Sequence, residues 1–152
     1  GASDNPTHGM HGLYVAKDRA EIATEDPLGN ALMSKFFHPY LTYNARIAAE
    51  FTGEFSLSFD TSKSYTHHSR YLKDVTLTGK NNSNVVVNQL DNHITGNVGR
   101  NAVLFSGNSS EYAIAKQANG STIVTDLVDA RDGRNILINI EVAKFSDAEI
   151  PL

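Results

Sequence analysis

The chain has 152 residues, a formal net charge of −4 and no cysteine. A chain of this length can bury one hydrophobic core, while the lack of thiols excludes disulfide bonds, thiolate zinc sites and cysteine catalysis. Since 13 Lys and Arg stand against 17 Asp and Glu without a basic block, we expect no nucleic-acid partner. No apolar run approaches the length of a membrane-spanning helix, so we expect no membrane span.

Residues 1–50 are predicted to form an N-terminal extension with short helices. Pro27 ends the first helix and Asn30 is a suitable N-cap for the second. The three predicted helices cover residues 18–23, 30–37 and 44–51. None is long enough to be stable alone. We therefore expect the extension to dock on the rest of the chain or on another domain or chain of the parent protein.

Residues 51–152 are predicted to form a β-rich domain. Apolar and polar side chains alternate over 51–60, as in a half-buried strand. The Asn119-Gly120 turn predicts a hairpin between strands over 112–115 and 122–125. A terminal strand is predicted over 136–142, and its apolar face would consist of Ile136, Ile138, Ile140 and Val142.

Between these elements the chain shows a short irregular repeat. Its β-prone stretches are centred at intervals of about nine residues on Leu77, Val86, Ile94 and Val103. Such an interval predicts the rungs of a parallel β-roll or β-helix, in which each short strand stacks on the equivalent strand of the previous coil. Asparagine and glycine between the rungs suit tight corners. An antiparallel sheet with Asn-rich turns is the alternative.

The repeat carries a family resemblance. Tyr71-Leu-Lys-Asp-Val-Thr-Leu-Thr-Gly79 and Asn88-Gln-Leu-Asp-Asn-His-Ile-Thr-Gly-Asn-Val-Gly99 resemble the entry into haemolysin-type calcium-binding repeats of the RTX kind. The segments that follow, up to about residue 148, look like those that follow such repeats in proteins exported by type I secretion. The resemblance implies a secreted, extracellular bacterial protein with calcium as a possible cofactor.

The chain departs from the RTX pattern where calcium would bind. The repeat G-G-x-G-x-D-x-U-x supplies carboxylates to each ion, but the nearest match here has Asn97 in place of a glycine and Asn101 in place of the ligating aspartate. Arg100 adds a positive charge beside them. We therefore expect a degenerate roll in which Asn101 is a weak calcium ligand.

A second candidate calcium site lies in the loop that follows the hairpin. Asp126, Asp129 and Asp132 are spaced by three residues near Gly133, and clustered carboxylates suit Ca²⁺, although the spacing is not that of an EF-hand. The alternative is a structural turn with solvated charges, pinned by Arg131 or Arg134.

Histidines offer a weaker metal candidate. His8 and His11 form an H-x-x-H pair that could bind a transition metal, but the spacing differs from that of the helical zinc motif. His67 and His68 are neighbours on a segment predicted to be extended, so their side chains would point to opposite faces and could not share one ion.

Three functions remain open from the sequence. The first is a non-catalytic C-terminal module that supports folding after export and stabilises or presents a neighbouring domain, since no hydrolase, phosphate-loop or dinucleotide motif is found. The second is a fragment or processed subunit of a secreted metal-dependent hydrolase or oxidoreductase, with His8, His11 or His38 near the metal. The third is a carbohydrate- or surface-binding adhesin module, with these aromatic residues as platforms: Tyr40, Tyr43, Tyr65 and Tyr71.

Overall fold

The computed structural model describes residues 16, 21–35 and 43–152. It divides into two compact units, residues 1–41 and residues 42–152.

The described part of the first unit consists of two short helices, α1 (Ile22–Glu25) and α2 (Pro27–Met33). Pro27 begins α2, because its fixed φ suits the first turn of a helix. The Asp26 carboxylate accepts a hydrogen bond from the Gly29 amide at 2.8 Å and caps this turn. The predicted N-cap at Asn30 is therefore wrong, since Asn30 lies inside α2.

The second unit is mainly β. It also contains a short helix, α3 (Thr66–Ser69), and a 3-10 helix, η2 (Ser109–Glu111). Its strands are β1 (Tyr43–Ile47), β2 (Gly53–Ser56), β3 (Leu72–Leu77), β4 (Ser83–Val86), β5 (His93–Thr95), β6 (Ala102–Leu104), β7 (Tyr112–Lys116), β8 (Thr122–Asp126), β9 (Arg134–Ile138), β10 (Val142–Lys144) and β11 (Glu149–Pro151).

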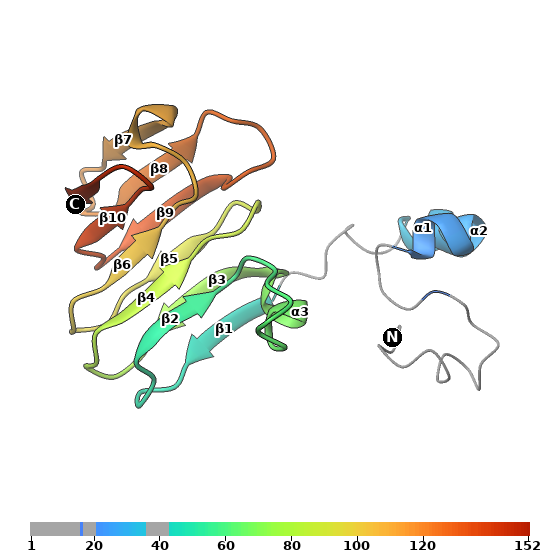
Figure 1. The fold of residues 1–152 in the computed structure, drawn as a ribbon, viewed down its shortest axis with the longest axis horizontal. Helices are drawn as coiled ribbons and strands as arrows, with labels where there is room; N and C mark the ends of the chain where they lie inside the picture. The colour runs from blue at the N-terminus through green and yellow to red at the C-terminus, as the bar shows by residue number, and fades with distance from the viewer. Residues whose placement is uncertain (1–15, 17–20, 36–42) are drawn as a thin grey trace. The chain divides into compact units, whose positions relative to one another are not determined.

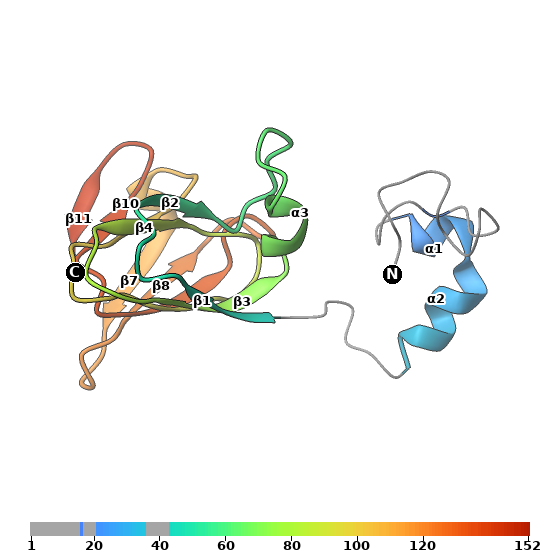
Figure 2. The ribbon, with the colours of Figure 1, turned by 90° about the horizontal axis from the view of Figure 1, so that it is seen from below.

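The strands form two mixed sheets that lie face to face (Figures 1 and 2). Sheet A has six strands in the order β1-β3-β5-β9-β8-β7, and sheet B has five in the order β11-β10-β6-β4-β2. The first four strands of sheet A are parallel to one another, as are β2, β4, β6 and β10. The chain thus passes from sheet A to sheet B in four strand pairs: β1–β2, β3–β4, β5–β6 and β9–β10.

The nine-residue interval has a different meaning from the one expected. Leu77 lies in sheet A, Val86 in sheet B, Ile94 in sheet A and Val103 in sheet B. One interval therefore carries the chain across to the opposite sheet. The parallel partner lies about two intervals away, because Val75 pairs with Ile94 and Val85 with Val103.

The core lies between the sheets and consists of rows of aliphatic residues in register. In sheet A the row is Val75, Ile94 and Leu137, and in sheet B it is Val85, Val103 and Ala143; each is at most 2% exposed. Burying a side chain of this size contributes about 1.5–3 kcal/mol. Each aliphatic side chain packs against the aliphatic side chain of the next strand in its row. This packing explains how strands of only three to six residues form stable sheets.

Buried asparagines satisfy backbone groups where the chain leaves the strands. The Asn88 and Asn92 amides both donate to the Leu72 carbonyl, at 3.0 and 3.1 Å. The Asn101 amide donates to the Ser83 carbonyl at 2.9 Å. Because an unpaired buried carbonyl costs free energy, these side chains stabilise the segments that connect the strands.

The prediction of a helix over 44–51 is wrong. Residues 43–47 form β1, which pairs in parallel with β3 over its whole length. The periodic placement of Ile47 and Phe51 is equally compatible with a strand and a following turn, and pairing with β3 decides between them. The strand predicted over 51–60 is shorter than expected, because β2 ends at Ser56.

The terminal strand is also different from the one predicted. Leu137 is buried at 2% exposure, whereas Ile136 and Ile138 lie half-buried on the outer face. Asn139 then adopts a positive φ of 52° and turns the chain toward sheet B. The hairpin prediction is confirmed, since β7 and β8 pair antiparallel and Gly120 takes φ 84° in the turn.

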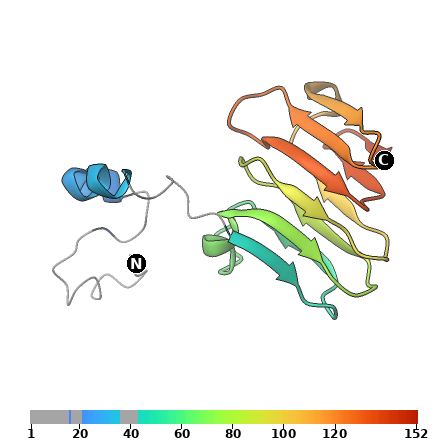
Figure 3. The ribbon, with the colours of Figure 1, turned by 180° about the vertical axis from the view of Figure 1, so that it is seen from behind.

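The two ends of the stack are different. At one end the parallel strands are followed by antiparallel strands, β8 and β7 in sheet A and β11 in sheet B. At the other end β1 is the edge of sheet A (Figure 3). The β2 edge is partly covered, because Tyr65 stacks on Phe55 at 5.3 Å and its hydroxyl accepts from the Ser56 amide at 3.3 Å. Within the described ranges, no helix has the length and apolarity that a membrane crossing needs.

Candidate functional site

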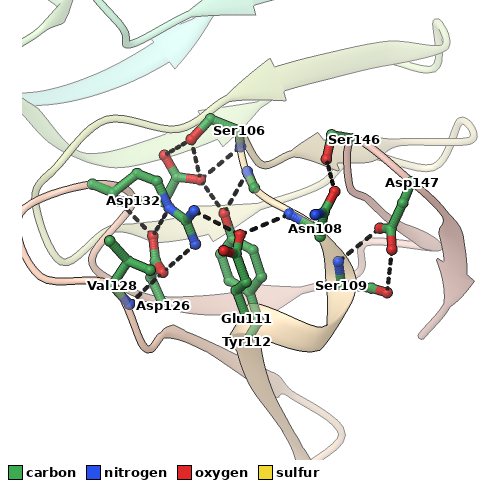
Figure 4. A network of polar contacts seen from close by, with 12 residues as sticks. Ser106, Asn108, Ser109, Glu111, Tyr112, Asp126, Val128, Asp132, Ser146 and Asp147 are labelled. Carbon is green, nitrogen blue, oxygen red and sulfur yellow. Dashed lines mark hydrogen bonds and ion pairs between the residues drawn. The ribbon is translucent and has the colours of Figure 1, made fainter.

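A polar network that includes Glu111, Asp126 and Asp132 lies at the end of the two sheets where β7 and β8 pair antiparallel, which we call the closed end of the stack (Figure 4). Arg131 is at the centre of its contacts. It lies in the loop after β8, and its Nε and one Nη donate to the two carboxylate oxygens of Asp126 at 2.7 and 2.6 Å. The other Nη donates to Glu111 of η2 at 2.7 Å. Planar two-point contact of this kind is the strongest form of ion pair. Arg131 thereby joins the hairpin, the loop and η2.

Asp132 is the buried partner of this network and is 5% exposed. Its carboxylate accepts from the Ser106 amide at 2.7 Å and from the Tyr112 hydroxyl at 2.6 Å. The Ser106 hydroxyl lies 2.9 Å from the same carboxylate. Because all these donors come from the segment after β6, Asp132 fixes β6 and the hairpin to the loop that leads into β9.

Aromatic packing surrounds the polar contacts. Phe105, Tyr112 and Phe145 contact one another with ring centroids 4.8–5.3 Å apart. The Arg131 guanidinium lies 5.0 Å from the centroid of the Tyr112 ring, a cation–π contact. A Cβ at Gly107 would collide with this guanidinium. A side chain at position 107 would therefore require the Arg131 guanidinium to shift.

The charges of the network stabilise one another. Burial alone would raise the pKa of Asp126, but hydrogen bonds from Arg131 and from the Val128 and Asp132 amides outweigh it and lower that pKa. The hydrogen bond from Arg131, together with one from the Asn108 amide, lowers the pKa of Glu111. Burial and the hydrogen bond to Asp132 raise the pKa of Tyr112. At neutral pH the carboxylates of Asp126 and Glu111 are therefore ionised and the Tyr112 phenol is neutral.

The structure brings together two of the four predicted calcium ligands. Asp126 and Asp132 both belong to the network, but their carboxylate oxygens already accept hydrogen bonds from protein groups. Asp129 is exposed. Asn101 takes part in a separate set of contacts, with Asn97 and Ser83. Arg131 does pin the turn, as the alternative expected, but the Asp126 and Asp132 carboxylates are buried and not solvated. Calcium binding stays a prediction, and an ion at Asp126 would have to displace Arg131.

The histidine candidates divide in two. His8, His11 and His38 lie outside the described residues. His67 and His68 lie on α3 and not on an extended segment, and the His67 ring packs edge-on against Phe59 at 5.0 Å. In the described part of the chain, no three His, Asp or Glu side chains are grouped to hold a metal ion.

A groove lies where strands β2, β4 and β6 of sheet B end. It consists of two adjoining cavities of about 500 Å³ each, which share Ser58 and Val86. We call it the sheet B groove. It is lined at one end by Phe59, Asp60, Thr61 and Lys63, and at the other by Asn88, Gln89, Leu104, Ser106, Arg131 and Asp132.

Two of the four tyrosines predicted as sugar platforms, Tyr65 and Tyr71, have side chains that the structure describes, and neither lines this groove. Tyr40 and the Tyr43 side chain are outside the described part of the structure. Tyr65 is used in packing on Phe55, and Tyr71 carries the Arg70 guanidinium 4.9 Å above its ring. Two phenylalanines line the groove: Phe105 is 6% exposed, whereas Phe59 is 44% exposed.

Sequence reasoning missed the parts of the network that are distant in the chain. Glu111, Tyr112 and Ser106 reach the loop from about 20 to 26 residues away. One local signal was available. Asn108-x-x-Glu111 has the spacing of a helix capping box, and the Glu111 carboxylate does accept from the Asn108 amide at 3.0 Å.

Comparison of the chain with protein-family models, with curated proteins and with solved structures found no match.

Proposed function

We propose that the chain is a non-catalytic, β-rich C-terminal module of a secreted bacterial protein, which supports folding after export and stabilises or presents a neighbouring domain. The observation that carries this proposal is the difference between the two ends of the stack. At one end the antiparallel hairpin β7–β8 forms the edge of sheet A and is fixed by the Arg131 network, while at the other end the edge of sheet A is the parallel strand β1.

The finer part of the proposal concerns the fold. We take the four strand pairs as coils of a short parallel β-helix, similar to a degenerate RTX roll. The parallel, in-register ladders of both sheets support this reading. The segments between coils, 57–71 and 105–133, would then be insertions that leave the stacking unchanged.

The Arg131 network supports a role that does not depend on tightly bound calcium. In RTX repeats a cation neutralises the carboxylates at the corners. Here the Arg131 guanidinium neutralises Asp126 and Glu111 from within the chain. The module would therefore complete its own fold and supply a rigid end to the parent protein.

The β1 edge supports contact with a neighbour. An edge strand presents backbone N–H and C=O groups that another strand can pair with. Ala45, on the inner row of β1, is only partly buried, whereas its row mates Val75 and Ile94 are 1% and 0% exposed. A neighbouring domain placed against β1 would cover this apolar surface.

The experiment is a refolding assay on a fusion protein. An aggregation-prone reporter enzyme is fused before Gly1, denatured in urea and diluted, and the recovered reporter activity is compared with that of the reporter alone. We expect a higher yield with the module. The increase should be lost with Asp132→Asn, which breaks the closed end, and kept with Asp129→Asn. Equal yields with and without the module would contradict the proposal.

A further inference from the structure

The sheet B groove has a floor that suits a flat ligand. Val86 and Leu104 are paired in register on adjacent parallel strands, and both are half-buried on the outer face of the sheet. Adjacent strands are spaced by about 4.8 Å, which is close to the length of one sugar ring in a linear polysaccharide. The floor consists of these two apolar positions, and their separation is about that of neighbouring sugar units.

The charged groups on the groove walls already have partners. Asp60 lies 3.7 Å from Lys63 and also accepts from the Ser62 hydroxyl at 2.6 Å. Arg131 is held by Asp126 and Glu111, and Asp132 by hydroxyl and amide donors. A charged ligand would gain little from ions that are paired within the protein. The groove thus favours an uncharged ligand.

Uncharged polar groups in the groove are free to bind. Ser58, Thr61 and Gln89 are exposed, and their side chains have no hydrogen-bond partner among the residues that the structure describes. Hydroxyl and amide groups both donate and accept. They match the alternating donors and acceptors of sugar hydroxyls.

Phe59 supplies an aromatic surface at one end of the groove. Its ring is held in place by the edge-on His67 ring at 5.0 Å and by the Arg70 guanidinium, 4.8 Å from its centroid. It is nevertheless 44% exposed. A fixed, exposed ring next to hydroxyl groups provides both an apolar contact and polar contacts for one sugar unit.

We propose that the sheet B groove binds a neutral oligosaccharide chain, with one sugar ring against Phe59 and the next units over Val86 and Leu104, hydrogen-bonded to Ser58 and Gln89. An extended peptide fits less well. Peptides that add to sheets do so at an edge, through backbone hydrogen bonds, whereas the floor here is a sheet face. This inference goes beyond the proposed function and does not depend on it.

The test is affinity electrophoresis of the full chain in gels that contain soluble neutral polysaccharides, namely xylan, laminarin and hydroxyethylcellulose, with polygalacturonate as the charged probe. We expect retardation by at least one neutral polymer and none by polygalacturonate. Phe59→Ala and Gln89→Ala should each weaken binding about tenfold. Leu127→Ala is the matched control, because Leu127 is an exposed apolar residue outside the groove.

Three results would overturn the inference. They are no retardation by any neutral polymer, equal retardation by polygalacturonate, or unchanged binding in both groove variants. Far-UV circular dichroism checks that the variants are folded, and Gln89→Ala changes only an exposed side chain. The refolding assay on the fusion protein does not depend on the groove, so a failure here leaves the proposed function to be judged separately.

Discussion

The four strand pairs and the closed end of the stack are held together by different forces. Between the strand pairs, rows of Val, Ile and Leu in register fill the core, and asparagines satisfy the backbone at the corners. At the closed end, Arg131, Asp126 and Glu111 form ion pairs around a cluster of aromatic rings.

The difference teaches how a stack of short strands can end. Packing between aliphatic rows is non-directional and extends from strand to strand, so it does not determine which strand is the last. Ion pairs and buried hydrogen bonds need defined geometry. The closed end therefore fixes one arrangement, whereas the strand pairs contribute rows of buried aliphatic side chains. The two regions should respond differently to cavities, to loss of a hydrogen bond, to acid and to calcium.

Removing a core side chain should have the largest effect. Leu137 is 2% exposed between the sheets, so Leu137→Ala should lower the free energy of unfolding by about 2–5 kcal/mol. Ile138→Ala, on the outer face of the same strand, is the control and should cost clearly less. Urea unfolding followed by circular dichroism measures both. Equal losses would mean that the inner row is not the main source of stability.

Changing the buried carboxylate should have the next largest effect. Asp132→Asn places an NH₂ group against the Ser106 and Tyr112 donors, so it should cost about 1–3 kcal/mol. Asp129→Asn changes an exposed neighbour in the same loop and should cost less than about 0.5 kcal/mol. Urea unfolding again provides the measurement. A cost for Asp129 as large as for Asp132 would contradict the assignment of the network.

Acid should weaken the closed end through its carboxylates. The pKa values of Asp126 and Glu111 are lowered in the folded state from the ordinary 3.8 and 4.5. The stability that they contribute is therefore complete above those ordinary values and is lost as the pH falls through the lower, folded values.

Arg131→Met should reduce this acid dependence, because the two carboxylates lose their partner. Part of the dependence should remain, since the pKa values of Asp60 and Glu149 are lowered by other partners. Arg134→Met is the control and should keep the full slope. The acid dependence of each variant is measured by thermal unfolding at a series of pH values from acid to neutral. An unchanged slope in Arg131→Met would show that the ion pairs do not couple to folding.

Calcium should have the smallest effect on the intact chain. Because hydrogen bonds from protein groups already occupy the oxygens of Asp126 and Asp132, we expect the thermal midpoint to be nearly the same with calcium as with a chelator. Arg131→Ser would free the carboxylates of Asp126 and Glu111, and this variant should respond more to calcium. A large calcium effect on the unmodified chain would show that the ion can displace Arg131.

Several elements could be predicted from the sequence because their signals are local. The hairpin follows from Asn119-Gly120, whose turn conformation needs only neighbouring residues. Leu77, Val86, Ile94 and Val103 all lie in strands, as their β-prone surroundings indicated. Arg131 was one of two candidates to pin the loop, together with Arg134, and the structure shows Arg131 on Asp126.

Other features depend on contacts between distant residues. The sequence pattern of β1 predicts a helix, and only its parallel pairing with β3 makes it a strand. Ile136 and Leu137 compete for the inner face of β9, and only pairing with β5 and β8 decides in favour of Leu137. The partners of Arg131 at Glu111 and Tyr112 come together only when the hairpin has folded. Neither local pattern nor spacing contains this information.

The pairing of β5 with β9 has a consequence for the order of folding. His93 pairs with Ile136. Strand β9 can therefore add to β5 only after the segment between residues 93 and 136 has formed a closed loop. Closing a loop of this length lowers the chain entropy before the contacts between β5 and β9 can offset that loss. The hairpin β7–β8 needs only neighbouring residues and can form within microseconds. It would then present β8 as a template for β9, and the final strands would close both sheets as the last step of folding.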